Sequence, residues 1–308
     1  MRKNTGASPR ASGAPVARGV ARGLLCTAAM TTAASTWILG LDLGDRSRGA
    51  LYFADWLAGP EHTHAIHVLE LWSRPYIRSD VGAAALEVAR SLAQELHISP
   101  PGRVTVQDAE TAEVGLAVAA EGAAGLVIGR AAGTGAHTAW GLGHVARRVL
   151  RSLPCPVVVV PRDLTAVAPG PVLLATDLGA ASTAAVAFAR ELAAKHGREL
   201  VVVHVVEDRY SDLIDDTDPI WQRGRDSYMD ELTDSVHSWM AEHALIGRPR
   251  IVHGSVVGEL RKLADATRAA LVVVGSRRLG TLGRIFLGST ASALAGRAPC
   301  PVAVVPSP

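Results

Sequence analysis

Residues 271–290 read LVVVGSRRLGTLGRIFLGST. An apolar run ends at Gly275, a loop with arginines and further glycines follows, and a helical pattern begins at Gly288-Ser289-Thr290. Glycines let the backbone come close to a ligand, and the unpaired N–H groups of a helix start favour an anion. Ser289 and Thr290 can add hydroxyl donors. The stretch therefore predicts a strand, a phosphate cradle and a helix, although it is neither a Walker A loop nor a GxGxxG fingerprint.

The composition is that of aliphatic sheets covered by helices. The 308 residues are 48% hydrophobic but only 4% aromatic, and this length favours two domains over one. The 31 basic and 29 acidic residues leave a net charge of +2, which gives no electrostatic footprint for nucleic acid. Three cysteines are too few for a disulfide framework and fit a reducing, cytoplasmic location. We expect Cys155 and Cys300 to be small buried hydrophobes rather than nucleophiles.

Residues 1–35 differ from the rest of the chain. They contain basic residues but no acidic residue, and their apolar stretch at residues 20–31 is interrupted by Arg22. No run there is long enough to span a bilayer, so we predict no membrane association. We interpret the segment as a disordered tail or as residues before a later start at Met30, with a weak signal or transit peptide as the alternative.

The rest of the chain contains the same pattern twice. Residues 153–161, LPCPVVVVP, return as residues 298–306, APCPVAVVP, and residues 37–44, WILGLDLG, return as residues 172–179, VLLATDLG. The same order and similar spacing of these segments indicate an internal duplication. The duplication gives a first domain over residues 36–162, a linker over residues 163–170 and a second domain over residues 171–308.

Each half alternates short apolar runs with helical patterns. This alternation predicts two tandem doubly wound α/β domains, each with five mostly parallel strands covered by helices on both faces. The expected strands run over residues 38–42, 65–71, 103–107, 125–129 and 157–160, and over 172–176, 200–206, 250–253, 270–275 and 302–305. The expected helices of the second half run over residues 182–196, 221–245, 257–267 and 289–296.

The second half resembles the universal stress protein family. That family has a loop Gly-x2-Gly-x9-Gly-Ser/Thr after the fourth strand of a five-stranded α/β domain. Here Gly275 begins the motif, Arg278 stands in place of the second glycine, and Gly288-Ser289 ends it. The family's acidic residue at the end of the first strand matches Asp177. Its closing Pro-x-Pro-Val strand matches residues 299–302, and the resemblance extends over nearly all of residues 37–306 as two copies.

The resemblance implies a Rossmann-like site for ATP, with Mg²⁺, in the second half of a stress-response sensor or regulator. It also implies an intrachain pseudo-dimer in which the two closing strands meet, with a further homodimer and an unknown regulatory protein as partners. Asp177 would lie beside the nucleoside, and the loop would wrap the phosphates. The Arg278 side chain either crowds the turn or pairs with a phosphate. The candidate binding residues are Asp177, Gly275, Arg277, Arg278, Gly288, Ser289 and Thr290.

The corresponding loop of the first half has diverged. After Gly129 the second glycine position is Ala132, and the final Gly-Ser/Thr has become Gly143-His144, one residue late. His144 lacks the hydroxyl, although the strand-end Asp42 remains. We therefore expect the nucleotide to be held mainly by the second half.

Three histidines, His62, His64 and His67, cluster around the second strand. Alternation along a strand puts His62 and His64 on one face and His67 on the other, and no Cys or acidic residue completes a ligand set. We predict ordinary surface or strand-edge histidines and no metal site.

Two other functions stay open. A nucleotide-free interaction or scaffold protein would have both loops degenerate. An enzyme of the wider adenine-nucleotide hydrolase superfamily would release product from ATP, but the PP-loop and HIGH motifs of that superfamily are missing. No residue is an obvious general base, so we expect no enzyme, with at most slow ATP hydrolysis that would need Mg²⁺.

Overall fold

The structure, a computed structural model, describes residues 36–77, 80–130, 141–179, 182–207, 219–276 and 289–307. The strands of the first half are β1 (Trp37–Gly40), β2 (Thr63–Glu70), β3 (Arg103–Ala109), β4 (Gly125–Gly129) and β5 (Val157–Val160). Those of the second half are β6 (Val172–Thr176), β7 (Leu200–Val206), β8 (Arg248–His253), β9 (Leu271–Ser276) and β10 (Val302–Pro306). The α-helices are α1 (Arg48–Ala58), α2 (Val81–Glu95), α3 (Ala112–Ala119), α4 (His144–Ser152), α5 (Thr183–Lys195), α6 (Pro219–Glu242), α7 (Val256–Ala266) and α8 (Ser289–Arg297).

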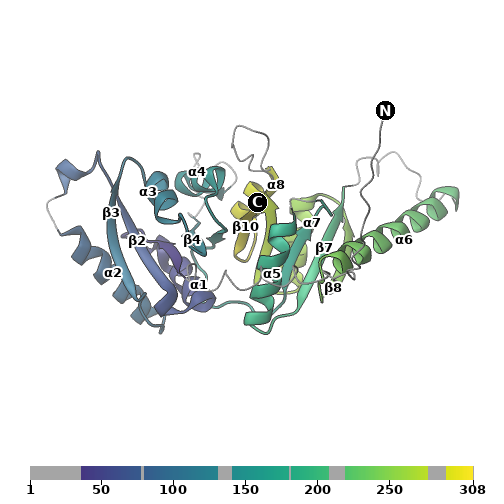
Figure 1. The fold of residues 1–308 in the computed structure, drawn as a ribbon, viewed down its shortest axis with the longest axis horizontal. Helices are drawn as coiled ribbons and strands as arrows, with labels where there is room; N and C mark the ends of the chain where they lie inside the picture. Colours follow the sequence, from purple (N-terminus) through teal and green to yellow (C-terminus); the bar gives the residue numbers. More distant parts are fainter. Residues whose placement is uncertain are drawn as a thin grey trace, which may run out of the picture. The chain divides into compact units, whose positions relative to one another are not determined.

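The described strands form one ten-stranded sheet in the order β3-β2-β1-β4-β5-β10-β9-β6-β7-β8 (Figure 1). Within each half every pair of neighbours is parallel. The pair β5–β10 is antiparallel, with Val302 opposite Val159 and Val304 opposite Val157. The predicted α/β class is therefore confirmed, and so is the meeting of the two closing strands. The two five-stranded sheets are joined edge to edge rather than merely adjacent.

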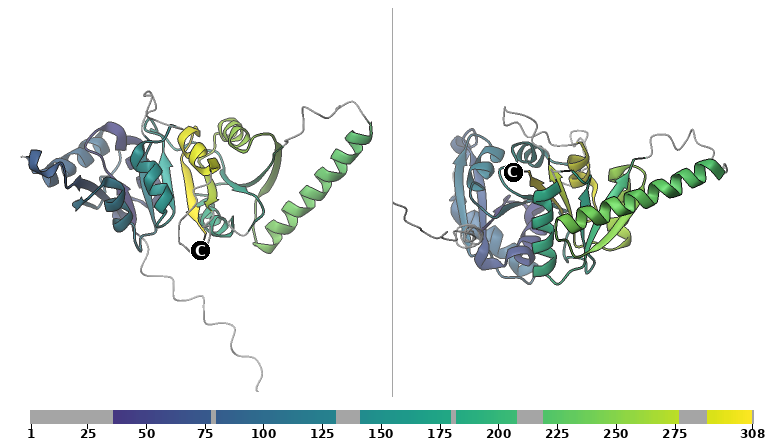
Figure 2. Two further views of the ribbon diagram at one scale, coloured as in Figure 1. Left: turned by 90° about the horizontal axis from the view of Figure 1, so that it is seen from above. Right: turned by 45° about the vertical axis from the view of Figure 1, so that its right-hand side comes forward.

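Alternation along the strands divides the core into two layers, one on each face of the sheet. In β1, Leu39 belongs to the layer under α1, α2, α5 and α6, while Ile38 belongs to the layer under α3, α4, α7 and α8. Successive side chains of a strand point to opposite faces, and strands buried on both faces read as continuous apolar runs. Figure 2 shows the helices on the two sides of the sheet. Each layer contains residues from both halves, so the two repeats share their cores.

Every predicted strand and helix lies within three residues of its observed ends, and the largest shift at a candidate site residue has a local cause. The strand expected over residues 38–42 ends at Gly40. The Leu41 N–H still donates to the Ile66 carbonyl, but the Asp42 N–H turns to the hydroxyl of Ser47 at 2.7 Å. The hydrogen bonds between β1 and β2 therefore stop at Leu41, one residue before Asp42. The long helix expected over residues 221–245 is α6, residues 219–242.

No helix in the described ranges combines the length and the apolar character that crossing a membrane requires.

Two helical glycines provide a matched test of the packing. A Cβ atom on Gly49 of α1 would lie 2.0 Å from the Pro161 carbonyl oxygen, whereas one on the exposed Gly224 of α6 would have no atom within 4 Å. Gly49→Ala should therefore lower the free energy of unfolding by roughly 1–3 kcal/mol, because of steric overlap. Gly224→Ala should raise it by roughly 0.5–1 kcal/mol, since alanine is the better helix former. Urea denaturation of both variants measures the difference, and an equal change in both would contradict the close contact.

Candidate functional site

A turn with an aspartate follows the first strand of each half. Asp42 follows β1, and its Oδ1 accepts a hydrogen bond from the Gly44 N–H at 2.6 Å. Asp177 follows β6, and its Oδ1 accepts from the Gly179 N–H at 3.0 Å. Aspartate side chains commonly bind the backbone two residues on in this way, which fixes the carboxylate direction. The structure thus gives both halves the same strand-end carboxylate.

A buried serine completes each turn. Ser47 accepts from the Asp42 N–H, whereas the Ser182 hydroxyl donates to Asp177 Oδ1 at 3.1 Å. The two turns differ in one charge: Arg46 Nε lies 3.3 Å from Asp42 Oδ2, while the matching position of the second half is an alanine. The i,i+4 pair of Asp42 with Arg46 therefore has no sequence counterpart in the second half, where Ala181 takes the place of the arginine.

A histidine of the second strand braces each turn. His67 Nδ1 lies 3.0 Å from the Leu41 carbonyl oxygen, and His204 Nδ1 lies 2.9 Å from the Thr176 carbonyl oxygen. Because a carbonyl oxygen only accepts, the Nδ1–H of each ring is the donor. Sequence reasoning treated His67 as a strand-edge histidine and gave it no part in the site. The matching His-Val pairs on the second strands of the two halves were the signal that could have identified it.

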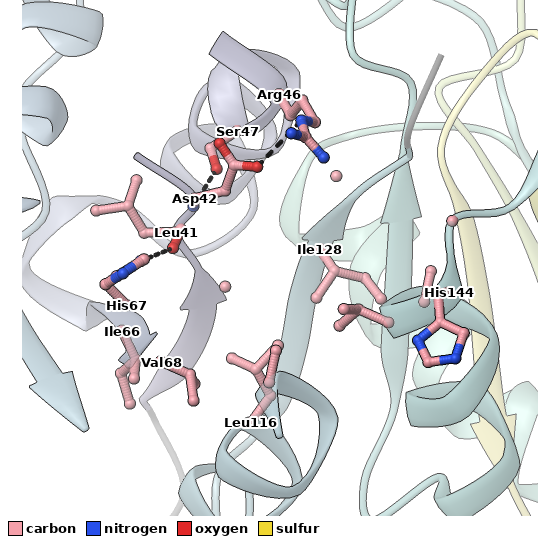
Figure 3. A pocket seen from close by; sticks show the side chains of 16 residues that line it. Leu41, Asp42, Arg46, Ser47, Ile66, His67, Val68, Leu116, Ile128 and His144 are labelled. Carbon is pink, nitrogen blue, oxygen red and sulfur yellow. Dashed lines mark hydrogen bonds and ion pairs between the residues drawn. The ribbon is translucent and has the colours of Figure 1, made fainter. Parts of the chain in front are cut away.

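A cavity of about 320 Å³ opens beside this turn in the first half (Figure 3). It lies where β1 and β4 are neighbours, which is where the strand order reverses. In open α/β sheets, ligands bind outside the carboxyl ends of the strands at this switch point. Apolar side chains form much of the wall, and Figure 3 shows Asp42 and His144 on opposite sides of the space. The apolar wall consists of Leu41, Ile66, Val68, Ala112, Leu116, Ile128, Val145 and Ala146.

The two ends of the first-half loop contact the last turn of α8. Arg130, directly after β4, donates through its guanidinium to the Ala298 carbonyl at 2.8 Å. Gly141 has φ of 73°, and a Cβ there would lie 2.5 Å from the Gly296 carbonyl oxygen. This position requires glycine because both the left-handed conformation and the close contact exclude a side chain. The C-terminal end of one repeat's helix is therefore held by the other repeat's loop.

The predicted residues of the second half lie partly within the described ranges. Asp177 and Gly275 share one edge of the sheet because β6 pairs with β9, with Ala175 opposite Val274. Thr290 lies in the first turn of α8, and Ser289 begins that helix. Arg277, Arg278 and Gly288 lie outside the described residues.

A buried hydroxyl group, that of Ser276, directly precedes the second-half loop of residues 277–288. The Ser276 hydroxyl ends β9, its residue is 2% exposed, and it has no hydrogen-bond partner in the part of the chain that the structure describes. A buried hydroxyl without a partner costs free energy unless a ligand or water satisfies it. Among the described residues, no group of three or more His, Cys, Asp or Glu side chains could hold a metal ion.

Comparison with known sequences gives one family. The sequence model of the universal stress protein family matches residues 37–161 and 170–306. A universal stress protein of Mycobacterium tuberculosis, Rv2005c, is 30% identical over 223 residues, covering 70% of this chain and 68% of its own. A Thermus aquaticus universal stress protein is 32% identical over 138 residues, covering 44% of this chain and 96% of its own. A Mycolicibacterium smegmatis relative is 33% identical over 152 residues, with 47% of its length covered.

Comparison with solved structures supports the fold. A Pseudomonas aeruginosa protein of unknown function has a TM-score of 0.62 at 18% identity, covering 89% of this chain and 93% of that one. A universal stress protein from Archaeoglobus fulgidus has a TM-score of 0.58 at 19% identity, covering 89% and 99%. At these identities the likeness concerns the fold alone.

The two described cysteines lie in the core, away from the strand-end turns. Burial raises the pKa of the Cys155 thiol and that of the Cys300 thiol to about 12 each. Both are free and buried in the layer under α4 and α8, so the expectation of small buried hydrophobes is confirmed.

We predict that this burial leaves the thiols of Cys155 and Cys300 unreactive in the folded chain. The thiolate is the reactive species, and a pKa of about 12 leaves on the order of one thiol in ten thousand ionised at pH 8. In a Cys26→Ser background, iodoacetamide at pH 8 should modify neither cysteine of the native protein and both after unfolding in urea, as read by intact mass. Rapid labelling of the native chain would contradict the burial.

Proposed function

The chain belongs to the universal stress protein family. From this premise we propose that its second half binds an adenine nucleotide, with ATP as the expected ligand, and that the protein acts as a stress-response sensor or regulator. The observation that carries the proposal is the strand-end turn of Asp177, which lies on the same sheet edge as Gly275. These two residues flank the switch point between β6 and β9. Nucleotides bind at such switch points in α/β sheets.

In the proposed site the nucleoside would bind beside the Asp177 carboxylate, whose position is fixed by hydrogen bonds. Asp177 is exposed, and the Gly179 N–H and the Ser182 hydroxyl fix one of its oxygens. An ionised carboxylate accepts charge-assisted hydrogen bonds, which suits the hydroxyl groups of a ribose. The turn therefore supports a sugar-binding role for this residue.

The phosphate side is proposed from the chemistry of the loop and the helix start. Arg277, Arg278 and Arg284 fall within the twelve or so residues between β9 and α8, and Gly288 ends that segment. Ser289 and Thr290, both hydroxyl residues in the sequence, are the first two residues of α8, where the helix dipole favours negative charge. Three guanidinium groups and a helix start together fit a polyphosphate. In this reading Arg278 pairs with a phosphate instead of crowding the turn.

We propose binding rather than turnover. Among the described residues, the proposed site includes one carboxylate, that of Asp177, which already accepts hydrogen bonds from Gly179 and Ser182. A general base must reach the proton that it abstracts, and the proposed set supplies none for a water attacking a phosphate. Mg²⁺, which commonly binds through phosphates with one or two carboxylates, would then serve to neutralise the phosphate charge.

A nucleotide-free interaction protein is the second candidate, and one observation favours it. Large apolar side chains are exposed after β2, with Trp72 at 68% and Tyr76 at 81% exposure beside Leu71 and Ile77. Exposed apolar side chains that cluster in this way mark partner surfaces. Nucleotide titration separates the two candidates.

Isothermal titration with ATP and Mg²⁺ should give one site per chain. The double variant Gly288→Val/Ser289→Ala should weaken ATP binding at least tenfold, because it fills the loop and removes a hydroxyl donor; such a loss corresponds to about 1.4 kcal/mol. The matched first-half variant Gly143→Val/His144→Ala should leave the affinity unchanged. Absence of heat and of any thermal shift at millimolar ATP would favour the nucleotide-free candidate. Equal losses in the two variants would place ATP in both halves.

A further inference from the structure

We propose that the first-half cavity binds a nucleoside, meaning a planar base with its hydroxylated sugar and no phosphate chain. The proposal rests on the proposed function, since it treats the two repeats as variants of one binding design. It assigns a different ligand to the half whose loop has diverged. The two halves would then sense two different species, a nucleotide and a nucleoside.

The size and the walls of the cavity fit a base. Its volume of about 320 Å³ lies at the lower end of the range of ligand pockets, roughly 300–1,000 Å³. Ile66 and Val68 of β2, Leu116 of α3 and Ile128 of β4 line it from several elements. Figure 3 shows these side chains together below the strand-end turn. Apolar walls with a few polar groups at the rim are what a planar heteroaromatic ring requires.

The polar rim fits the hydroxyl groups of a sugar. Asp42 repeats the Asp177 turn, with one carboxylate oxygen held by the Gly44 N–H and the other beside Arg46. Ser47 and His67 occupy the same relative positions as their second-half counterparts and also line the cavity. The nucleoside side of the binding design is therefore preserved in the first half.

The features proposed to bind phosphate in the second half have no counterpart in the first half. Of the residues that line the cavity, Arg46 alone carries a permanent positive charge, and Asp42 pairs with it. Residues 131–143 contain no Lys or Arg, whereas residues 277–288 contain three arginines. Helix α4 begins at His144 with Gly143 before it, so its start has no hydroxyl side chain and no side-chain cap. The first-half cavity therefore offers little positive charge to neutralise a chain of phosphates.

The arginine that directly precedes the loop forms its hydrogen bonds with α8 and the residue after it. Arg130 directs its guanidinium to the Ala298 carbonyl and, at 3.5 Å, to that of Ala295. Gly141, at the other end of the loop, packs against the Gly296 carbonyl. Arg130 and Gly141 therefore contact the end of α8, and neither lines the cavity. This arrangement favours a ligand that ends at the sugar.

Isothermal titration of the full-length chain with adenosine and, separately, with ATP and Mg²⁺ tests the proposal. An adenosine site should weaken at least tenfold in Asp42→Asn and in Val68→Phe, which fills the cavity. That site should keep its affinity in Asp177→Asn and in Val205→Phe, the matched second-half variants. ATP binding should show the opposite dependence. Val68 and Val205 occupy equivalent positions after the bracing histidines, and far-UV circular dichroism of each variant controls for folding.

The outcomes separate this inference from the proposed function. Adenosine binding that is absent, or insensitive to both Asp42→Asn and Val68→Phe, overturns the nucleoside site even if ATP still binds the second half. ATP binding that depends on Asp42 overturns it as well, because the first half would then accept phosphates. Loss of all ATP binding together with Asp42-dependent adenosine binding would overturn the proposed function and support the nucleoside site.

Discussion

The rest of the structure depends on the antiparallel pairing of β5 with β10. The four valines of β5 are almost completely buried, and three of them lie opposite Val302, Ala303 and Val304. Each strand would otherwise be an unpaired, apolar edge of a five-stranded sheet, which invites aggregation. The pairing closes both edges at once and allows helices of the two halves to cover common core layers.

The same pairing makes the repeats unequal. It brings the end of α8 against the first-half loop, where Arg130 caps the Ala298 carbonyl and Gly141 packs on Gly296. Cations near a helix C-terminus are favourable, so this contact both stabilises α8 and fixes the loop ends. The other end of α8 begins at Ser289, which belongs to the proposed phosphate site. In this account α8 contributes its first residues to the proposed second-half site and contacts, near its end, the residues that flank the first-half loop.

Most strands and helices could be predicted from the sequence, because the spacing of apolar residues and the residue types at strand ends are local signals. The strands over residues 157–160 and 172–176 were predicted to the residue, and Asp177 was placed at a strand end. The resemblance implied that the closing strands meet, but the roles of His67 and of Arg130, which contacts α8, could not be predicted. Each depends on contacts between segments far apart in the chain, and a lone histidine or arginine carries no signal of its partner. The repeat alignment of His67 with His204 was the one clue available.

The central claim is that both halves have the same strand-end aspartate turn, at Asp42 and Asp177, for a nucleoside. In this account only the second half, with three arginines in residues 277–288, has the positive charge that binds phosphates. Photolabelling of the full chain with 8-azido-ATP, followed by peptide mapping, tests it most directly. The account predicts covalent label on peptides from residues 170–306, suppressed by excess ATP. Label shared equally between those peptides and peptides from residues 37–161, or found on the latter alone, would contradict it.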